Sequence, residues 1–118
     1  MQSLKVTTIQ TNLYWEGIHK NLEHFNEKLN ALLEQTDIII LPEMFTTGFT
    51  MNPVLLAEEH GGKGLHWMQQ KAKEKHAVLV GSISVKDKQQ YYNRLYWVMP
   101  DGAYQFYDKR HLFQMGKE

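Results

Sequence analysis

A glutamate and a lysine are the residues of this chain best placed to do chemistry. Glu43 follows the apolar run 38–41, and the residues around it are also apolar: Pro42, Met44, Phe45 and Phe49. Apolar surroundings remove water from a carboxyl group, which raises its pKa and makes it a better base near neutral pH. From its position alone, Glu43 is either a general base or a glutamate in a surface turn.

Lys109 lies in the charged segment 108–111, directly after the aromatic segment 103–107. By itself such a segment is typical of a solvated loop. A lysine held where little water reaches it has another use, because its charge then stabilises an oxyanion strongly. Lys109 therefore becomes a candidate only if the fold brings it to a second reactive group.

Other chemical groups of the chain do not form a recognisable motif. Zinc sites need three or four converging ligands, and the six histidines lack the helical spacing that provides them. The glycine-rich segment 61–64 lacks the order of a phosphate-binding loop, and we interpret it as a flexible entry to a helix. The serines at 3, 82 and 84 lie in expected strands without a placed base. We expect no metal and no cofactor.

The first part of the chain predicts a strand, a helix and a buried strand. Alternating residues indicate a strand over 4–10, and a stripe at spacings of three and four indicates a helix over 16–34. The uninterrupted apolar run 38–41 is typical of a central parallel strand covered on both faces. Together these elements form a βαβ unit, which places Glu43 at the carboxyl end of a strand, where α/β proteins bind ligands.

The second part of the chain predicts a helix followed by antiparallel strands. After a loop over 46–53, we expect a helix over 65–75 and strands over 77–85 and 91–99. Pro-Asp-Gly at 100–102 is a turn signal, so the segment 103–107 is expected to return as a hairpin partner. The fold class is therefore α/β.

Composition narrows the range of functions. Hydrophobic residues make up 42% of the 118 residues and charged residues 22%, as in globular proteins. The 13 basic and 13 acidic residues cancel, so we expect neither a nucleic-acid nor a membrane partner. No apolar run is long enough to span a bilayer, and the first residues do not resemble a secretory signal. We expect a cytoplasmic protein.

Two motifs and their order resemble the nitrilase superfamily of carbon–nitrogen hydrolases. The segment 41–49, LPEMFTTGF, is similar to the glutamate motif of that family, and its Thr-Thr-Gly-Phe ending looks most like the ω-amidase branch. The segment 107–113, YDKRHLF, resembles the lysine motif. The intervening YYNRLYWVMPDG also resembles the family. The resemblance implies an αββα sandwich, of which residues 1–118 form the N-terminal portion of a single domain.

The resemblance also implies a role for individual residues. Glu43 matches the general base and Lys109 matches the lysine that stabilises the tetrahedral intermediate. Asn93 matches a position near the site, although an ordinary polar strand residue is an equally good interpretation. Further residues are expected to line the pocket or orient its groups: Phe45, Phe49, His111 and Glu118.

The nucleophile of this family is a cysteine downstream of the lysine, and the present sequence contains no cysteine. We therefore expect a truncated chain that is inactive alone. The parent protein is expected to be a homodimer that releases ammonia from a small linear amide through a cysteine thioester. Two alternatives remain: a non-catalytic α/β binding or scaffold domain that is complete as it stands, and a cysteine-free inactive relative.

Overall fold

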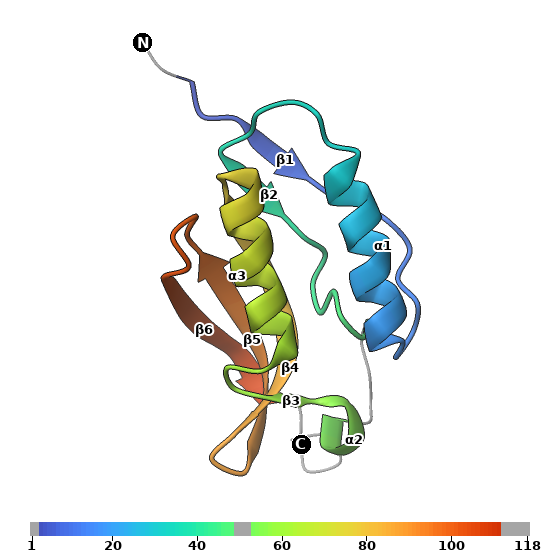
Figure 1. Ribbon diagram of the computed structural model, residues 1–118. Coiled ribbons are helices and arrows are strands. Elements are labelled where there is room, and N and C mark those ends of the chain that lie inside the picture. The colour runs from blue at the N-terminus through green and yellow to red at the C-terminus, as the bar shows by residue number, and fades with distance from the viewer. Residues whose placement is uncertain (1–2, 49–52, 112–118) are drawn as a thin grey trace.

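The computed structural model describes residues 3–48 and 53–111, without the side chains of residues 110 and 111. The described residues form a six-stranded mixed sheet, and α1 and α3 lie on one of its faces (Figure 1). The elements, in chain order, are β1 (Val6–Thr8), α1 (Ile18–Asn30), β2 (Ile38–Ile40), α2 (Pro53–Leu56), β3 (Glu58–Glu59), α3 (Lys63–Lys75), β4 (Val78–Asp87), β5 (Gln90–Val98) and β6 (Tyr104–His111). The predicted α/β class is confirmed.

The sheet has a parallel half and an antiparallel half. Its strand order is β1-β2-β4-β5-β6, and β3 pairs with the far end of β4. β1, β2 and β4 are parallel, whereas β4, β5 and β6 run antiparallel. The predicted βαβ unit is present as β1, α1 and β2.

Helix α1 is shorter than the predicted range 16–34. Its buried stripe includes Leu22, Phe25 and Leu29, as the periodicity indicates. The helix ends at Asn30, and Leu33, which lies within the predicted range, is 92% exposed. The predicted range was too long because Leu33 matches the helical spacing, although it does not lie in the core.

Helix α3 begins two residues earlier than predicted, because the chain provides a partner for its first N–H groups. The Glu58 carboxylate accepts hydrogen bonds from the Gly64 N–H at 2.9 Å and the Leu65 N–H at 3.4 Å. Burial raises the pKa of Glu58 above its ordinary value, although these two backbone hydrogen bonds oppose the increase. A Cβ on Gly64 would lie 2.7 Å from Ile83 Cδ1, so glycine allows the helix to approach β4 closely. Lys63 and Gly64 therefore belong to the helix, and Gly61 and Gly62 precede it.

The sheet contains two hairpins, and the Pro-Asp-Gly turn joins the second of them as predicted. Met99 N–H donates to the Ala103 carbonyl at 2.8 Å, and Gly102 has a φ of +94°. At the β4–β5 turn, Lys88 and Gln89 both have positive φ, which matches the right-handed twist of a tight hairpin. β6 continues to residue 111, beyond the predicted 103–107, so Lys109 lies within a strand and not in a loop.

The core lies between the sheet and the two long helices. Phe25, Phe45 and Trp67 meet there, with ring centroids 5.5 to 6.4 Å apart. Its other buried members include Leu22, Leu29, Ile39, Leu65, Met68, Leu79, Ile83, Val85, Tyr96 and Val98. Within the described residues, no helix is long and apolar enough to cross a membrane.

Candidate active site

Glu43 lies in a turn that follows β2 and is fastened to β4. The Leu41 N–H donates to the Val80 carbonyl at 2.8 Å, before the turn. After it, the Met44 N–H donates to Ser82 Oγ at 2.8 Å. Met44 has a φ of +50°, which is uncommon for a residue with a side chain and needs support from its surroundings. The hydrogen bonds on both sides of Glu43 provide that support.

Two side chains from the antiparallel half of the sheet converge on Glu43. Lys109 Nζ donates to Glu43 Oε2 at 2.6 Å, and Asn93 Nδ2 donates to the same oxygen at 2.8 Å. The side chains of Glu43 and Lys109 are 37% and 40% exposed, whereas Asn93 is 1% exposed. Asn93 and Lys109 follow Glu43 in the sequence by 50 and 66 positions, and the fold brings all three together.

Lys109 occupies an irregular place in the sheet. Asn93 pairs with Arg110 and Arg94 pairs with Asp108, so Lys109 is the extra residue of a bulge in β6. Bulges are common beside active sites because the extra residue is turned out of the regular alternation. The bulge lies where β6 passes Glu43 and directs the ammonium toward the carboxylate.

Asn93 connects the site to the interior of the sheet. Its Nδ2 donates a hydrogen bond to Glu43, whereas its Oδ1 has no hydrogen-bond partner among the described residues. Ser84, which pairs with Asn93 across β4 and β5, also has a buried hydroxyl without a partner there. Buried polar atoms of this kind are rare. Both belong to paired residues of β4 and β5, and one of them is the residue that donates to Glu43.

Ser82 supports the site but was not expected to take part in it. Its hydroxyl accepts from the Met44 N–H, and its carbonyl accepts from the Phe45 N–H at 3.2 Å. The serine is 1% exposed. The sequence signal was the alternation of Ser82 and Ser84 with Ile83 and Val85, since a polar stripe within a buried strand indicates partners from another segment.

Of the remaining expected site residues, the structure describes the side chain of Phe45 alone. Phe45 is fully buried in the core, where it packs against Phe25 and Trp67 rather than facing the surface around Glu43. A Cβ on Gly81 would lie 3.0 Å from its ring, so the sheet is shaped to admit it. His111 is the last residue of β6, but its side chain lies outside the described part of the chain. Phe49 and Glu118 lie outside it as well.

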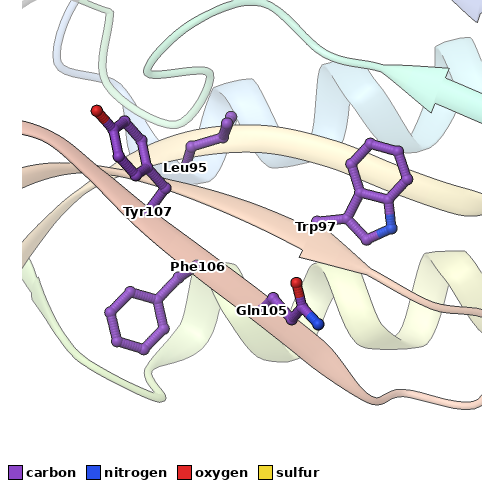
Figure 2. Close-up of a pocket in the computed structure, with 5 residues that line it drawn as sticks. All are labelled: Leu95, Trp97, Gln105, Phe106 and Tyr107. Carbon is purple, nitrogen blue, oxygen red and sulfur yellow. The ribbon is translucent and has the colours of Figure 1, made fainter.

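A shallow groove of about 310 Å³ lies at the outer edge of the sheet (Figure 2). Its lining residues are Leu95, Trp97, Gln105, Phe106 and Tyr107. In this view the Trp97 and Tyr107 side chains rise from the same side of β5 and β6. They are 42% and 67% exposed. Within the described residues, this face of the sheet is open.

The site contains groups for acid–base chemistry and for stabilising negative charge. Glu43 can accept a proton, Lys109 offers a cation within hydrogen-bond distance, and Asn93 holds the carboxylate. The described residues contain no group of three or more histidines or carboxylates able to hold a metal ion. With no cysteine in the sequence, these groups can serve a nucleophile but do not include a thiol.

The sequence matches a known protein family over nearly its whole length. A family model described as carbon-nitrogen hydrolase matches residues 5–118. The omega-amidase YafV of Escherichia coli K12 is 39% identical over 120 aligned positions, which cover 100% of this chain and 45% of that protein. The 2-oxoglutaramate amidase of Bacillus subtilis is 36% identical, over 84% of this chain and 38% of its own length.

The fold is similar to that of solved structures. XC1258 from Xanthomonas campestris, described as a CN-hydrolase superfamily protein with an arsenic adduct in the active site, superposes with a TM-score of 0.89 at 36% identity. That superposition covers 100% of this chain and 44% of the other. The chain thus spans less than half the length of the relatives it matches.

Proposed function

The chain belongs to the carbon–nitrogen hydrolase family, and from that membership we propose that it provides the general base and the oxyanion-stabilising lysine of an ω-amidase. The observation that supports this most is the convergence of Lys109 Nζ and Asn93 Nδ2 on one oxygen of Glu43. A surface carboxylate has no need of a buried amide to orient it. We assign Glu43 as the base and Lys109 as the stabilising cation.

We further propose that residues 1–118 act as the N-terminal portion of a single catalytic domain. The relatives that match the whole chain are more than twice as long. The nucleophile would then be a cysteine supplied by residues outside the present sequence, which has none. The open sheet face beside Trp97 and Tyr107 would be covered by that part of the domain.

The proposed reaction begins with transfer of the thiol proton to Glu43. The thiolate attacks the amide carbonyl carbon, and the carbonyl oxygen becomes an oxyanion that the Lys109 ammonium stabilises. Glu43 then returns its proton to the nitrogen, the carbon–nitrogen bond breaks, and ammonia leaves. Water, deprotonated by Glu43, attacks the thioester, releasing the carboxylic acid and regenerating the thiol. No cofactor takes part in these steps.

The proposed substrate is a small linear amide, most simply the ω-amide of a keto acid or a dicarboxylic acid. Two relatives carry names of this kind, an omega-amidase and a 2-oxoglutaramate amidase. A homodimer and a cytoplasmic location belong to the same proposal. Size-exclusion chromatography with light scattering and cell fractionation test these two points directly.

The test of the proposed function is ammonia release from 2-oxoglutaramate by the full-length protein that carries this chain. We expect turnover by the full-length protein and none by residues 1–118 alone, because sites of this type lose almost all their rate when one member is missing. Glu43→Gln is expected to lower kcat by about 10²- to 10⁴-fold, the usual contribution of a general base. Glu23→Gln, an exposed exchange on α1, is the matched control.

Two results would overturn the proposal. Turnover by residues 1–118 at a rate comparable to that of the full-length protein would show that no cysteine is needed. A full-length protein that binds ω-amides but releases no ammonia would favour the non-catalytic alternative.

A further inference from the structure

Two consecutive residues of β5 hold the two halves of the site from opposite faces of the sheet. Asn93 donates to Glu43, and Arg94 binds Asp108, the residue directly before Lys109. Because successive side chains of a strand point to opposite faces, Asn93 reaches the site while Arg94 lies behind it. Arg94 touches neither Glu43 nor Lys109 in any described contact, and the reaction proposed above does not use it.

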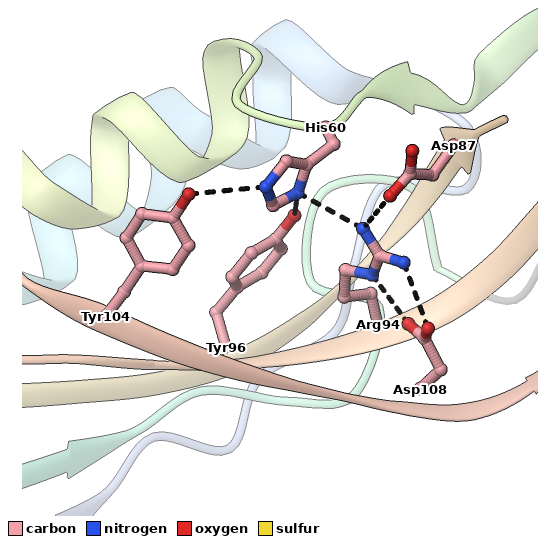
Figure 3. A network of polar contacts seen from close by, with 6 residues as sticks. All are labelled: His60, Asp87, Arg94, Tyr96, Tyr104 and Asp108. Atoms are coloured by element: carbon pink, nitrogen blue, oxygen red, sulfur yellow. Dashed lines mark hydrogen bonds and ion pairs between the residues drawn. The ribbon is translucent and has the colours of Figure 1, made fainter.

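The Arg94 guanidinium contacts two carboxylates and an imidazole (Figure 3). It is 3% exposed and binds both oxygens of Asp108, with Nε–Oδ1 at 2.6 Å and Nη2–Oδ2 at 2.9 Å. Its Nη1 donates to Asp87 Oδ2 at 2.8 Å. The Phe106 ring lies 4.1 Å from its central carbon. A cation with two carboxylate partners and a ring against its plane has very little freedom to move.

His60 closes the network on the helix side. Its Nδ1 lies 3.1 Å from Arg94 Nη1, and a guanidinium can only donate, so Nδ1 accepts this hydrogen bond. Its Nε2 lies 3.2 Å from the Tyr104 hydroxyl. Burial raises the pKa of Tyr96, whose hydroxyl lies 3.0 Å from the same Nδ1. Burial opposes the charge of Arg94, but the hydrogen bonds to Asp108 and Asp87 outweigh it and raise the pKa of Arg94 further.

The network adjoins the bulge that contains Lys109, because Asp108 belongs to the network and directly precedes Lys109. Lys109 is the extra residue in β6, between Asp108 and Arg110, and the regular ladder does not fix such a residue. Asp108 is the last regularly paired residue before it and is locked by a bidentate contact. The bulge is therefore anchored on one side by this bidentate contact, and Lys109 follows the anchored residue directly.

We propose that Arg94 is a positioning residue that acts through Asp108 to hold Lys109 at Glu43. The proposal rests on the role assigned to Lys109 in the proposed function, and extends it to a residue on the other face of the sheet. A misplacement of about 1 Å in a reacting group can lower a rate about 100-fold, so a device that fixes the bulge has a direct effect on turnover.

The simpler alternative is that Arg94 only stabilises the β5–β6 hairpin. The two carboxylates on Arg94 separate these possibilities, because both bind the same guanidinium but only Asp108 adjoins Lys109. Asp87 lies at the end of β4, where it pairs with Gln90. Loss of either carboxylate weakens the network, whereas only loss of Asp108 releases the bulge.

The experiment compares Asp108→Asn with Asp87→Asn in the full-length protein. For Asp108→Asn we expect kcat and kcat/KM to fall together by about 100-fold, and for Asp87→Asn we expect both to stay near the wild-type values. Arg94→Lys keeps the charge but cannot bind both Asp108 oxygens, so it is expected to behave like Asp108→Asn. This second variant decides the question if Asp108→Asn does not fold.

Crystal structures of the same variants give a result that does not depend on turnover. We expect the 2.6 Å contact between Lys109 Nζ and Glu43 Oε2 to be lost in Asp108→Asn and kept in Asp87→Asn. If the contact survives in both Asp108→Asn and Arg94→Lys, the positioning role is wrong, whatever the rates. If the wild-type protein releases no ammonia, the proposed function fails, and the Lys109–Glu43 contact in the variants still decides the role of Arg94.

Discussion

Asn93 Nδ2 lies 2.8 Å from Glu43 Oε2, although Asn93 is almost fully buried and Glu43 is more than a third exposed. A rigid strand residue therefore holds a side chain that would otherwise sample several rotamers in a turn. Lys109 binds the same oxygen from the neighbouring strand. The carboxylate is oriented by two donors from the antiparallel half of the sheet, while its backbone belongs to the parallel half.

Replacement of Asn93 by alanine is the first test of this arrangement. Asn93→Ala removes the donor that orients Glu43, so we expect kcat in the full-length protein to fall by about 10- to 100-fold, because orientation of a reacting group is lost while its chemistry remains. The assay is ammonia release from an ω-amide. Asn30→Ala, at the exposed end of α1, is the control. A wild-type kcat in Asn93→Ala would leave Asn93 as an ordinary strand residue.

Lys109 is expected to act through its charge and its position. Lys109→Met retains the length of the side chain but removes the cation, and loss of one oxyanion-stabilising group lowers kcat by about 10²- to 10³-fold. Lys109→Arg keeps the charge in a different shape and is expected to recover only part of this loss. Lys28→Met, on the exposed face of α1, provides the matched control, and an equal effect in both methionine variants would contradict the assignment.

Sequence patterns predicted the elements that present Glu43 better than those that present Lys109. The apolar run 38–41 and the helical stripe before it determine a βαβ unit, and the end of β2 then fixes where Glu43 must lie. Local signals suffice there because each element is specified by its own periodicity. The Pro-Asp-Gly turn was likewise readable from the residues themselves.

The bulge at Lys109 could not be predicted from β6 alone. Its place depends on the partner strand, where Asn93 and Arg94 oppose three residues instead of two. The Arg94 network depends on contacts with His60 and Asp87, which come from other parts of the chain. Single-sequence patterns contain no information about such pairings, so the device that fixes Lys109 became visible only in the folded chain.

The place of Phe45 also depends on the folded chain. It stands two residues after Glu43, so proximity in sequence suggested a place in the pocket. The positive φ at Met44 turns the chain between them, and the Phe45 ring enters the core instead.

The core position of Phe45 predicts an effect on stability. Phe45→Ala removes a fully buried ring that contacts Phe25 and Trp67, and the free energy of unfolding is expected to fall by about 3 to 5 kcal/mol. Urea denaturation followed by tryptophan fluorescence measures the loss. Leu33→Ala, at a 92% exposed position, is expected to change little. Equal stability of the two variants would place Phe45 outside the core.

Glu58 predicts a dependence of stability on pH. Burial raises the pKa of Glu58 in the folded chain above its ordinary value of 4.5. A carboxyl group with a raised folded pKa contributes its stability fully below the unfolded pKa, and this contribution is lost as the pH rises through the folded pKa. Glu58→Gln does not titrate. The unfolding free energy of the wild type, relative to Glu58→Gln, is therefore expected to decrease between about pH 4 and about pH 7.

Urea denaturation of both proteins at the two pH values measures this difference. A difference between wild type and Glu58→Gln that does not vary with pH would contradict the burial argument.

The open sheet face predicts how residues 1–118 behave when produced alone. Trp97 and Tyr107 lie on this face with 42% and 67% of their surfaces exposed, and contiguous exposed apolar surface drives association. We expect the isolated chain to form dimers or larger species as its concentration rises, as measured by light scattering. Trp97→Lys combined with Tyr107→Lys places two charges on the face and should shift the chain toward monomer. Leu55→Lys, at an 82% exposed position on α2, should not, and association that survives the double exchange would show that another surface is responsible.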